Sequence, residues 1–168
     1  MKLLWPCVIA AALVLPVSAP QAQPVRAGAP APEIDLPALG GGRVLLSKLR
    51  GHPVVVSFWG TWCPPCRSEF PELVQAHQRY GPDGLYVLGV NGRDQELRTK
   101  NVQQFVDEFG VKFQIALDER GRARRNYGLV GLPTTVFIDS GGVVKRVHIG
   151  PIDREELVKG ISAIRSPL

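Results

Sequence analysis

The 168-residue sequence has only three cysteines and no stripe of clustered basic residues, and each shortage excludes a class of protein. A small secreted protein held by a disulfide framework would use more cysteines, spaced far apart to close long loops. A nucleic-acid-binding protein would need a basic stripe or a motif, whereas the net charge of +5 is spread along this chain. The composition is that of one ordinary globular domain, large enough to bury a core of its own.

The one long apolar run lies at the start of the chain, over residues 3–17, behind a single lysine and ahead of small residues. This order predicts a secretory signal peptide over residues 1–22. The run is shorter than the roughly 20 apolar residues that a membrane helix needs. Because Pro20 disturbs both obvious cleavage sites, an uncleaved membrane anchor is the alternative. Either outcome predicts a periplasmic or otherwise extracytoplasmic protein.

The rest of the chain divides into a short leader and one domain. Residues 23–32 are rich in Pro and Ala and predict a flexible leader, followed by a domain over residues 33–168. Strand signals lie at residues 34–39, 43–46, 54–58, 85–90, 113–117, 134–138 and 143–149, and helix signals lie at 63–80, 102–109, 120–127 and after the capping residue Asp153. This order predicts an α/β fold with an N-terminal β-hairpin and a mixed central β-sheet flanked by helices on both faces. Trp59 is expected to pack in the core or at its rim, and Tyr127 and Phe137 in the core.

Loss of the signal peptide, which contains Cys7, would leave two cysteines, Cys63 and Cys66, between a buried strand and a helix. Two cysteines separated by two residues close almost no loop and so stabilise the fold little. Near the helix start, unpaired backbone N–H groups and the helix dipole favour a thiolate, which lowers the pKa of Cys63. We therefore expect Cys63 to be the exposed nucleophile and Cys66 the partly buried resolving thiol, the two forming a disulfide when oxidised.

Zinc is the main alternative for such a C-x-x-C pair, but a structural zinc site needs four ligands. The chain has no second cysteine pair, and its three histidines do not have ligand spacing. We therefore expect neither a metal nor another cofactor at these cysteines.

A second segment of interest, Gly131-Leu132-Pro133-Thr134-Thr135, stands directly before a predicted strand. Proline is tolerated at the first residue of a strand. A cis peptide bond at Pro133 would let the chain pass close to the dithiol and offer backbone groups to a substrate strand. An ordinary turn proline is equally compatible with the sequence.

Four segments carry a family resemblance: Phe58-Trp59-Gly60-Thr61-Trp62-Cys63-Pro64-Pro65-Cys66, Glu69-Phe70-Pro71, Leu132-Pro133-Thr134-Thr135 and Ala31-Pro32-Glu33. Together they resemble the TlpA/ResA-like extracytoplasmic thiol–disulfide oxidoreductases of the thioredoxin superfamily, over roughly Ala31 to Ile164. The resemblance implies a thioredoxin fold, a cis-proline at Pro133 and usually a reducing role. Members often reduce protein disulfides of apocytochrome c or of copper-site proteins, and the expected electron donor is a membrane thiol.

The resemblance also implies roles for residues around the cysteines. Those expected to bind substrate are Trp62, Pro64, Pro65, Leu132 and Pro133. Thioredoxin has a buried aspartate at the position of Ser57, so its proton-relay group is missing here. Glu69 matches a glutamate near the active site of the ResA branch, and we hypothesise that it assists proton transfer to Cys66. A glutamate on the helix surface is the alternative.

The alternatives of a disulfide oxidase, a peroxiredoxin and a copper chaperone each need sequence features that this chain lacks or has only in part. The absence of a histidine between the cysteines favours a reductase over a disulfide oxidase such as DsbA. A peroxiredoxin needs threonine or serine three residues before its reactive cysteine, where this chain has Gly60. A copper chaperone would need a wider cysteine spacing and a distant histidine, for which His148 is a weak candidate. The arginines of residues 120–125 indicate a solvated helix face, with an acidic partner as the alternative.

Overall fold

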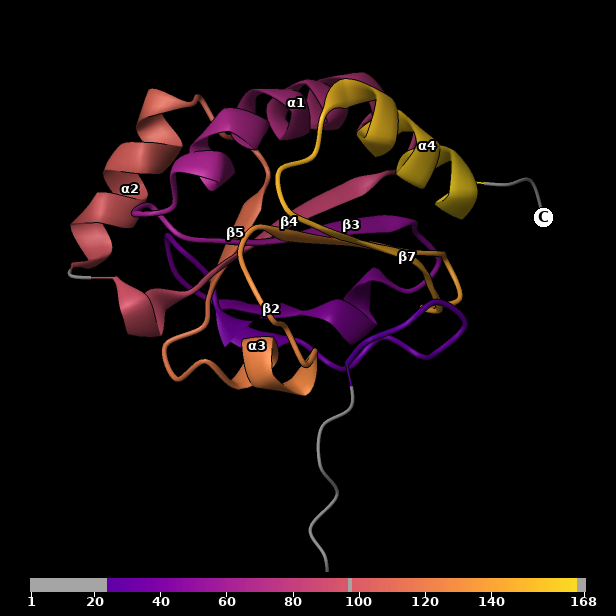
Figure 1. Ribbon diagram of the computed structural model, residues 1–168, viewed down its shortest axis with the longest axis horizontal. Helices are drawn as coiled ribbons and strands as arrows, with labels where there is room; N and C mark the ends of the chain where they lie inside the picture. The colour runs from indigo at the N-terminus through magenta and orange to yellow at the C-terminus, as the bar shows by residue number, and fades with distance from the viewer. Residues whose placement is uncertain (1–23, 97, 166–168) are drawn as a thin grey trace, which may run out of the picture.

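The computed structural model describes residues 24–96 and 98–165, so the predicted signal peptide lies outside the described residues. A five-stranded sheet stands at the centre, in the order β5-β4-β3-β6-β7 (Figure 1). Its strands are β3 (Val54–Trp59), β4 (Tyr86–Asn91), β5 (Gln114–Leu117), β6 (Thr134–Ile138) and β7 (Val144–Ile149). Strands β3, β4 and β5 are parallel, whereas β6 and β7 each run antiparallel to their neighbour. The predicted mixed α/β sheet is confirmed.

Both faces of this sheet are covered. Helices α1 (Pro64–Tyr80), α2 (Thr99–Glu108) and α4 (Arg154–Ile164) lie on one face (Figure 1). On the other face lie α3 (Arg122–Asn126), a two-stranded antiparallel sheet of β1 (Asp35–Pro37) and β2 (Arg43–Leu45), and the short helix η1 (Leu46–Leu49). Since side chains alternate between faces, β3 contributes to both cores, and every one of its residues is buried.

Local sequence explains where the helices begin. Asp153 caps α4, and its Oδ1 accepts a hydrogen bond from the backbone N–H of Glu156 at 2.9 Å, as predicted. Helix α3 is shorter than its predicted span, because Gly121 precedes it in the left-handed conformation at φ 62°. A further short helix, η2 (Arg93–Gln95), follows β4 and was not predicted.

Part of the predicted flexible leader is bonded to the domain. The backbone N–H groups of Val25, Gly28 and Ala31 donate to the carbonyl oxygens of Tyr127, Val144 and Gly142 at 2.8–3.0 Å. The bond to Val144, together with the bond from Val144 N–H to the carbonyl oxygen of Ala29 at 2.9 Å, gives partners to backbone groups at the start of the edge strand β7. Among the described helices, none combines the length and the apolar character needed to cross a bilayer.

A group of aromatic rings in tilted and edge-to-face contact packs the start of α1 against the end of β3. The ring centroids of Trp59, Phe70 and Phe105 lie 4.5–4.7 Å from one another. Trp59 is fully buried, which confirms its expected place in the core. The guanidinium of Arg67 lies 5.1 Å above the ring of Phe105, so α1 and α2 are also joined at the protein surface. This packing holds rigid the elements that flank the cysteines.

The packing of α4 on the sheet leads to a test. A methyl group added at Gly160 would lie 2.2 Å from ring atoms of Phe137. We expect Gly160→Ala to lower the free energy of unfolding by about 1–3 kcal/mol, because this overpacking outweighs the better helix propensity of alanine. Urea unfolding measures the change. Ser162→Ala, an exposed site in the same helix, should shift it by less than about 0.5 kcal/mol, and an equal effect of both variants would contradict the close packing.

Candidate active site

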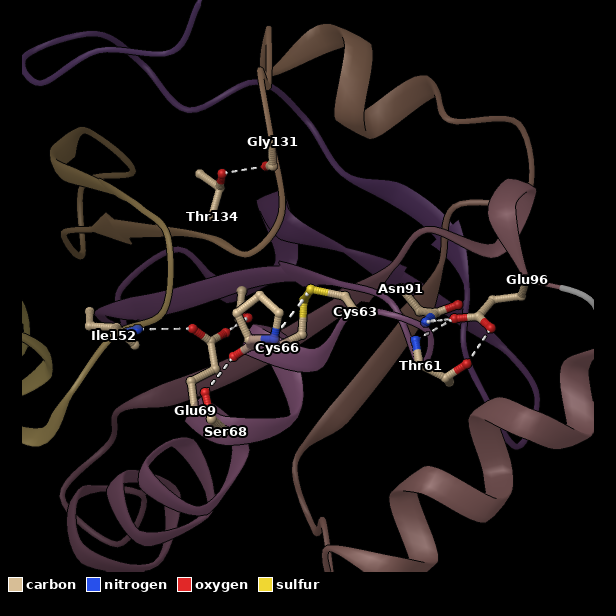
Figure 2. The surroundings of a disulfide bond; sticks show 12 residues. Thr61, Cys63, Cys66, Ser68, Glu69, Asn91, Glu96, Gly131, Thr134 and Ile152 are labelled. Carbon is tan, nitrogen blue, oxygen red and sulfur yellow. Dashed lines mark hydrogen bonds between the residues drawn. A yellow bond between two sulfur atoms is a disulfide. The ribbon is translucent and has the colours of Figure 1, made fainter.

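The two cysteines lie at the start of α1, directly after the loop that leaves β3 (Figure 2). Cys63 is the N-cap residue and has extended backbone, and Pro64 takes the first helical position. The Sγ atoms of Cys63 and Cys66 are bonded to each other, and the backbone N–H of Cys66 donates to Cys63 Sγ at 3.3 Å. The sulfur of Cys63 thus lies at the N-terminus of a 17-residue helix, where Cys66 supplies the first backbone N–H because Pro64 and Pro65 have none.

The expectation that Cys63 is exposed is wrong for this disulfide form. Cys63 is 3% exposed and Cys66 is fully buried. The N-cap geometry turns the Cys63 sulfur inward to Cys66 and its backbone N–H, so the exposed surface belongs to its neighbours. Trp62 is 51% exposed, and both Pro64 and Pro65 are exposed.

The indole of Trp62 folds back over the chain that precedes it. A Cβ atom at Gly60 would lie 2.8 Å from Trp62 Nε1, so only glycine leaves room for this arrangement. Gly60, where a peroxiredoxin would have threonine or serine, is therefore the residue over which the indole of Trp62 lies.

The proline segment reaches the same end of the sheet. The peptide bond between Leu132 and Pro133 is cis, and Pro133 is buried whereas Leu132 is half-buried. Thr134 pairs with Phe58 in the ladder of β6 and β3, which places this segment beside the strand end that leads to the cysteines. Thr134 Oγ1 donates to the carbonyl oxygen of Gly131 at 2.8 Å and so braces the loop (Figure 2).

Glu69 is buried on α1, three residues after Cys66 and hence on the same side of the helix. Ser57 Oγ donates to its Oε1 at 3.0 Å, and the backbone N–H of Ile152 donates to its Oε2 at 3.2 Å (Figure 2). Burial raises the pKa of Glu69 to about 7, and the two hydrogen bonds offset only part of this effect. The alternative of a surface glutamate is wrong, because the side chain points into the core beneath the cysteines.

A second buried carboxylate, Glu96, was missed by the sequence reasoning. Its Oε1 accepts from the backbone N–H of Thr61 at 2.7 Å and from Asn91 Nδ2 at 3.0 Å, and its Oε2 accepts from Thr61 Oγ1 at 2.5 Å (Figure 2). Glu96 therefore anchors the loop two residues ahead of Cys63. The sequence contained one indication of a polar site here, because Asn91 is a polar residue at the end of an otherwise apolar strand next to β3.

Other groups named from the sequence lie away from the cysteines or are engaged elsewhere. Within residues 24–96 and 98–165, no three His, Cys, Asp or Glu side chains form a group that could hold a metal ion. His148 Nε2 lies 3.1 Å from the carbonyl oxygen of Pro151. Of the basic run, Arg124 forms an ion pair with Asp94 at 3.0 Å, whereas Arg120 and Arg122 are exposed. Tyr127 and Phe137 are buried in the core, as expected.

Comparison with known proteins gives consistent matches over most of the chain. Residues 27–147 match the model of the AhpC/TSA family. The chain is 35% identical to the thiol-disulfide oxidoreductase ResA of Geobacillus thermodenitrificans over 141 residues, which cover 84% of this chain and 79% of that protein. It is 33% identical to the thioredoxin-like protein YneN of Bacillus subtilis over 133 residues, covering 79% of this chain and 77% of that one.

Solved structures agree with the sequence matches. One is the crystal structure of a Chlorobium tepidum protein assigned as thiol:disulfide interchange protein DsbE. It superposes with a TM-score of 0.76 at 35% identity and covers 83% of this chain and 98% of that chain. The fold predicted from the sequence, a thioredoxin fold with an added N-terminal hairpin, is therefore confirmed.

The raised pKa of Glu69 makes stability depend on pH. Between pH 4.5 and about 7 the folded protein keeps a proton on Glu69 that the unfolded chain has released, so the free energy of unfolding falls as pH rises through this window. The expected loss is on the order of 3 kcal/mol. Urea unfolding of Glu69→Gln at several pH values should lack this decline, whereas the exposed Glu119→Gln should retain it. A decline of the same size in Glu69→Gln would contradict the assignment.

The bonds of Glu96 predict a second effect on stability. Glu96→Gln keeps the shape of the side chain but turns one acceptor oxygen into an NH₂ donor that meets the donors of Thr61 and Asn91. We expect a loss of about 1–3 kcal/mol in the free energy of unfolding. Glu119→Gln again serves as the matched control, and equal stability of the two variants would argue against the observed bonds.

Proposed function

Because the chain belongs to the AhpC/TSA family and is a thiol–disulfide oxidoreductase of the ResA-like kind, we propose that it reduces protein disulfides through Cys63 and Cys66. In this proposal Cys63 attacks the substrate and Cys66 resolves the mixed disulfide. The observation that carries the assignment of roles is the position of the Cys63 sulfur at the start of α1, where the N–H of Cys66 donates to it. Both this N–H and the helix dipole favour a thiolate there.

The proposed reaction balances in two exchanges. The Cys63 thiolate attacks one sulfur of the substrate disulfide, the substrate S–S bond breaks, and the other substrate sulfur leaves as a thiolate that takes a proton from water. Cys66 then attacks Cys63 Sγ while its proton passes to Glu69, and the second substrate sulfur leaves. Two electrons have moved from the dithiol to the substrate. An external thiol donor returns Cys63 and Cys66 to the reduced form.

Glu69 suits the role of proton acceptor in the second exchange. Its pKa of about 7 means that the carboxyl group can take up and release a proton near neutral pH. Its place one helical turn from Cys66 puts it on the buried side of the pair. Cys66 is itself fully buried in the disulfide form, so water is a poor alternative acceptor for its proton.

Substrate recognition is proposed for the surface that surrounds the cysteines. Trp62, Pro64 and Pro65 are exposed on one side of them, and the half-buried Leu132 precedes the cis-proline, Pro133, at the same end of the sheet. These side chains offer an apolar rim to an extended segment of a partner protein, whose backbone could bond alongside Leu132 and Pro133.

We further propose that the protein works outside the cytoplasm. The apolar run behind Lys2 supports export through a signal peptide or an N-terminal membrane anchor in residues 1–22. A membrane thiol donor would then supply electrons, and apocytochrome c or copper-site proteins are the substrate classes that the family resemblance favours. Expression of the full-length sequence, followed by detection of the protein in a periplasmic or membrane fraction rather than a cytoplasmic one, tests this location.

Substitution of the cysteines tests the division of roles. Cys63→Ser should lose all catalysis of insulin reduction by dithiothreitol, because the attacking thiol is gone and the rate falls to that of dithiothreitol alone. Cys66→Ser should still attack but accumulate a mixed disulfide, which intact-mass spectrometry detects. In Cys66→Ser, the pH profile of Cys63 alkylation should give a pKa below the free value of about 8.5. Alkylation no faster than that of a free cysteine would contradict the proposed nucleophile.

The reduction potential tests the direction of electron flow. Equilibration of Cys63 and Cys66 with dithiothreitol or glutathione buffers should give a value near that of thioredoxin, about −270 mV. The Pro64-Pro65 pair contains no histidine to stabilise the thiolate strongly, which supports this expectation. A value near that of DsbA, about −120 mV, would assign the protein as an oxidase instead.

A further inference from the structure

The two most exposed large apolar side chains of the described residues lie at one recess, next to the cis-proline. Val130 is 80% exposed and Ile149 is 60% exposed. Val130 stands three residues before Pro133, and Ile149 pairs with Thr134, the residue that follows this proline. Both line the same recess. A single exposed apolar residue is ordinary, whereas apolar side chains gathered around one recess indicate an interaction surface.

The recess is suited to an apolar guest. Its aliphatic walls come from the leader, from the loop before the cis-proline and from β7, and consist of Val25, Leu129, Val130, Val147 and Ile149. None of the described residues that line it is charged. The two hydroxyls among them, of Tyr127 and Thr134, already donate to the carbonyl oxygens of Pro32 and Gly131. Its volume of roughly 70 Å³ is several times the about 10–15 Å³ that one water needs, so an aliphatic side chain can enter.

Strand β7 has an open backbone edge beside this recess. The N–H of Gly150 donates to the carbonyl oxygen of Pro133 at 2.9 Å. Because bonded and non-bonded pairs alternate along an antiparallel ladder, the backbone N–H and C=O groups of Ile149 and Val147 point away from β6. No backbone bond outside the β6–β7 ladder reaches these two residues from the described parts of the chain. An edge of this kind is a template for one more strand.

The leader leaves this part of the edge open. It bonds only the start of β7, where Val144 accepts from Gly28 and donates to Ala29. At Val25 its backbone instead donates to the carbonyl oxygen of Tyr127 at 2.9 Å, which fixes one wall of the recess. The recess and the open edge at Val147 and Ile149 therefore form one continuous surface, which we call the β7 strip.

The β7 strip is continuous with the surface proposed to receive substrate. Ile149 lies two strands from Phe58 at the end of β3, with Thr134 between them, a span of about 10 Å. Three to four residues of extended chain cover roughly this distance. A segment that bonds alongside Leu132 while its cysteine reacts with Cys63 can therefore reach the strip within a few residues.

We propose that the β7 strip binds an extended apolar segment of the substrate protein, a few residues from the cysteine that Cys63 attacks. The segment adds a short strand along Val147 and Ile149, and one of its aliphatic side chains enters the recess. Main-chain bonds then give affinity, and the recess gives selectivity for an apolar residue. The inference rests on the proposed reduction of protein disulfides and names the substrate class as disulfides flanked by extended apolar sequence. The residues of the strip position the substrate and touch no reacting sulfur.

Paired peptides test this selectivity. Each peptide carries a disulfide and a six-residue extension on one side of it, with either leucine or serine at alternate positions of the extension. With dithiothreitol as electron donor and the full-length chain as enzyme, we expect kcat/KM to be about tenfold higher for the leucine peptide, through a lower KM. Methylation of single backbone nitrogens in the extension should weaken binding at alternate residues, because every second N–H of an added strand faces β7.

Substitution of the rim supplies the second arm. Val130→Ser and Ile149→Ser should each remove most of the preference for leucine, by raising the KM of the leucine peptide rather than by lowering kcat. Both sites are exposed, so the fold should tolerate serine. Val158→Ser, at an exposed valine of α4 away from the cysteines, is the matched control and should keep the preference.

A small aromatic disulfide, 5,5′-dithiobis(2-nitrobenzoate), separates this inference from the function it rests on. Equal kcat/KM for both peptides, with normal reduction of the small disulfide, would remove the strip and leave the dithiol function intact. Reduction of no disulfide at all would remove both. A preference that survives in Val130→Ser and Ile149→Ser would also overturn the proposal. So would a dimer in sedimentation that Ile149→Ser dissociates, or a preference that appears only without residues 1–22, because the strip would then bind a second copy or the chain's own N-terminus.

Discussion

The geometry of this protein depends on the placement of one helix N-terminus at the end of one buried strand. Strand β3 is buried along its whole length, and the rings of Trp59 and Phe70 fix it to α1 on either side of the turn. The N–H of Cys66, the first in α1, then donates to the sulfur of Cys63 rather than to water. Thiolate chemistry at neutral pH requires such a fixed electropositive surrounding, and packing far from the sulfur provides it.

Buried carboxylates serve this arrangement in two different ways. Glu96 accepts three hydrogen bonds and holds the loop before Cys63 in place. Glu69 accepts two and remains poorly solvated, so its pKa rises towards neutrality. Burial opposes the charged form of Glu69, and its two donors offset only part of this effect. One carboxylate thus acts as an anchor, and the other is available as a proton acceptor.

Polar groups inside the sheet reduce stability, and their positions relate to the proposed chemistry. Ser57, Thr135 and Glu69 lie on the face that carries the larger apolar core, where aliphatic side chains would pack with less penalty. The resemblance to known families covers the cysteines and Glu69, whereas the place of Thr135 opposite Ser57 emerges only from strand register.

The sequence by itself determined the elements and the reacting pair. The run of β-branched residues at 54–58, the helical spacing after it and the capping residue Asp153 predicted the strand, α1 and α4, because these signals are local along the chain. The C-x-x-C spacing together with Pro64 placed a redox pair at a helix start. These inferences depend only on residues a few positions apart.

Only the tertiary structure determined which of these side chains are buried and which groups they contact. The low exposure of Cys63, the contact of Glu69 with Ile152 and the bond of Thr61 to Glu96 join residues that local patterns do not connect. The place of Ser57 opposite Thr135 depends on the pairing of β3 with β6, and a shift of one residue would turn each side chain to the other face. Local propensity carries no information about such pairing, so the burial of Glu69 and its hydrogen-bond partners became visible only in the folded chain.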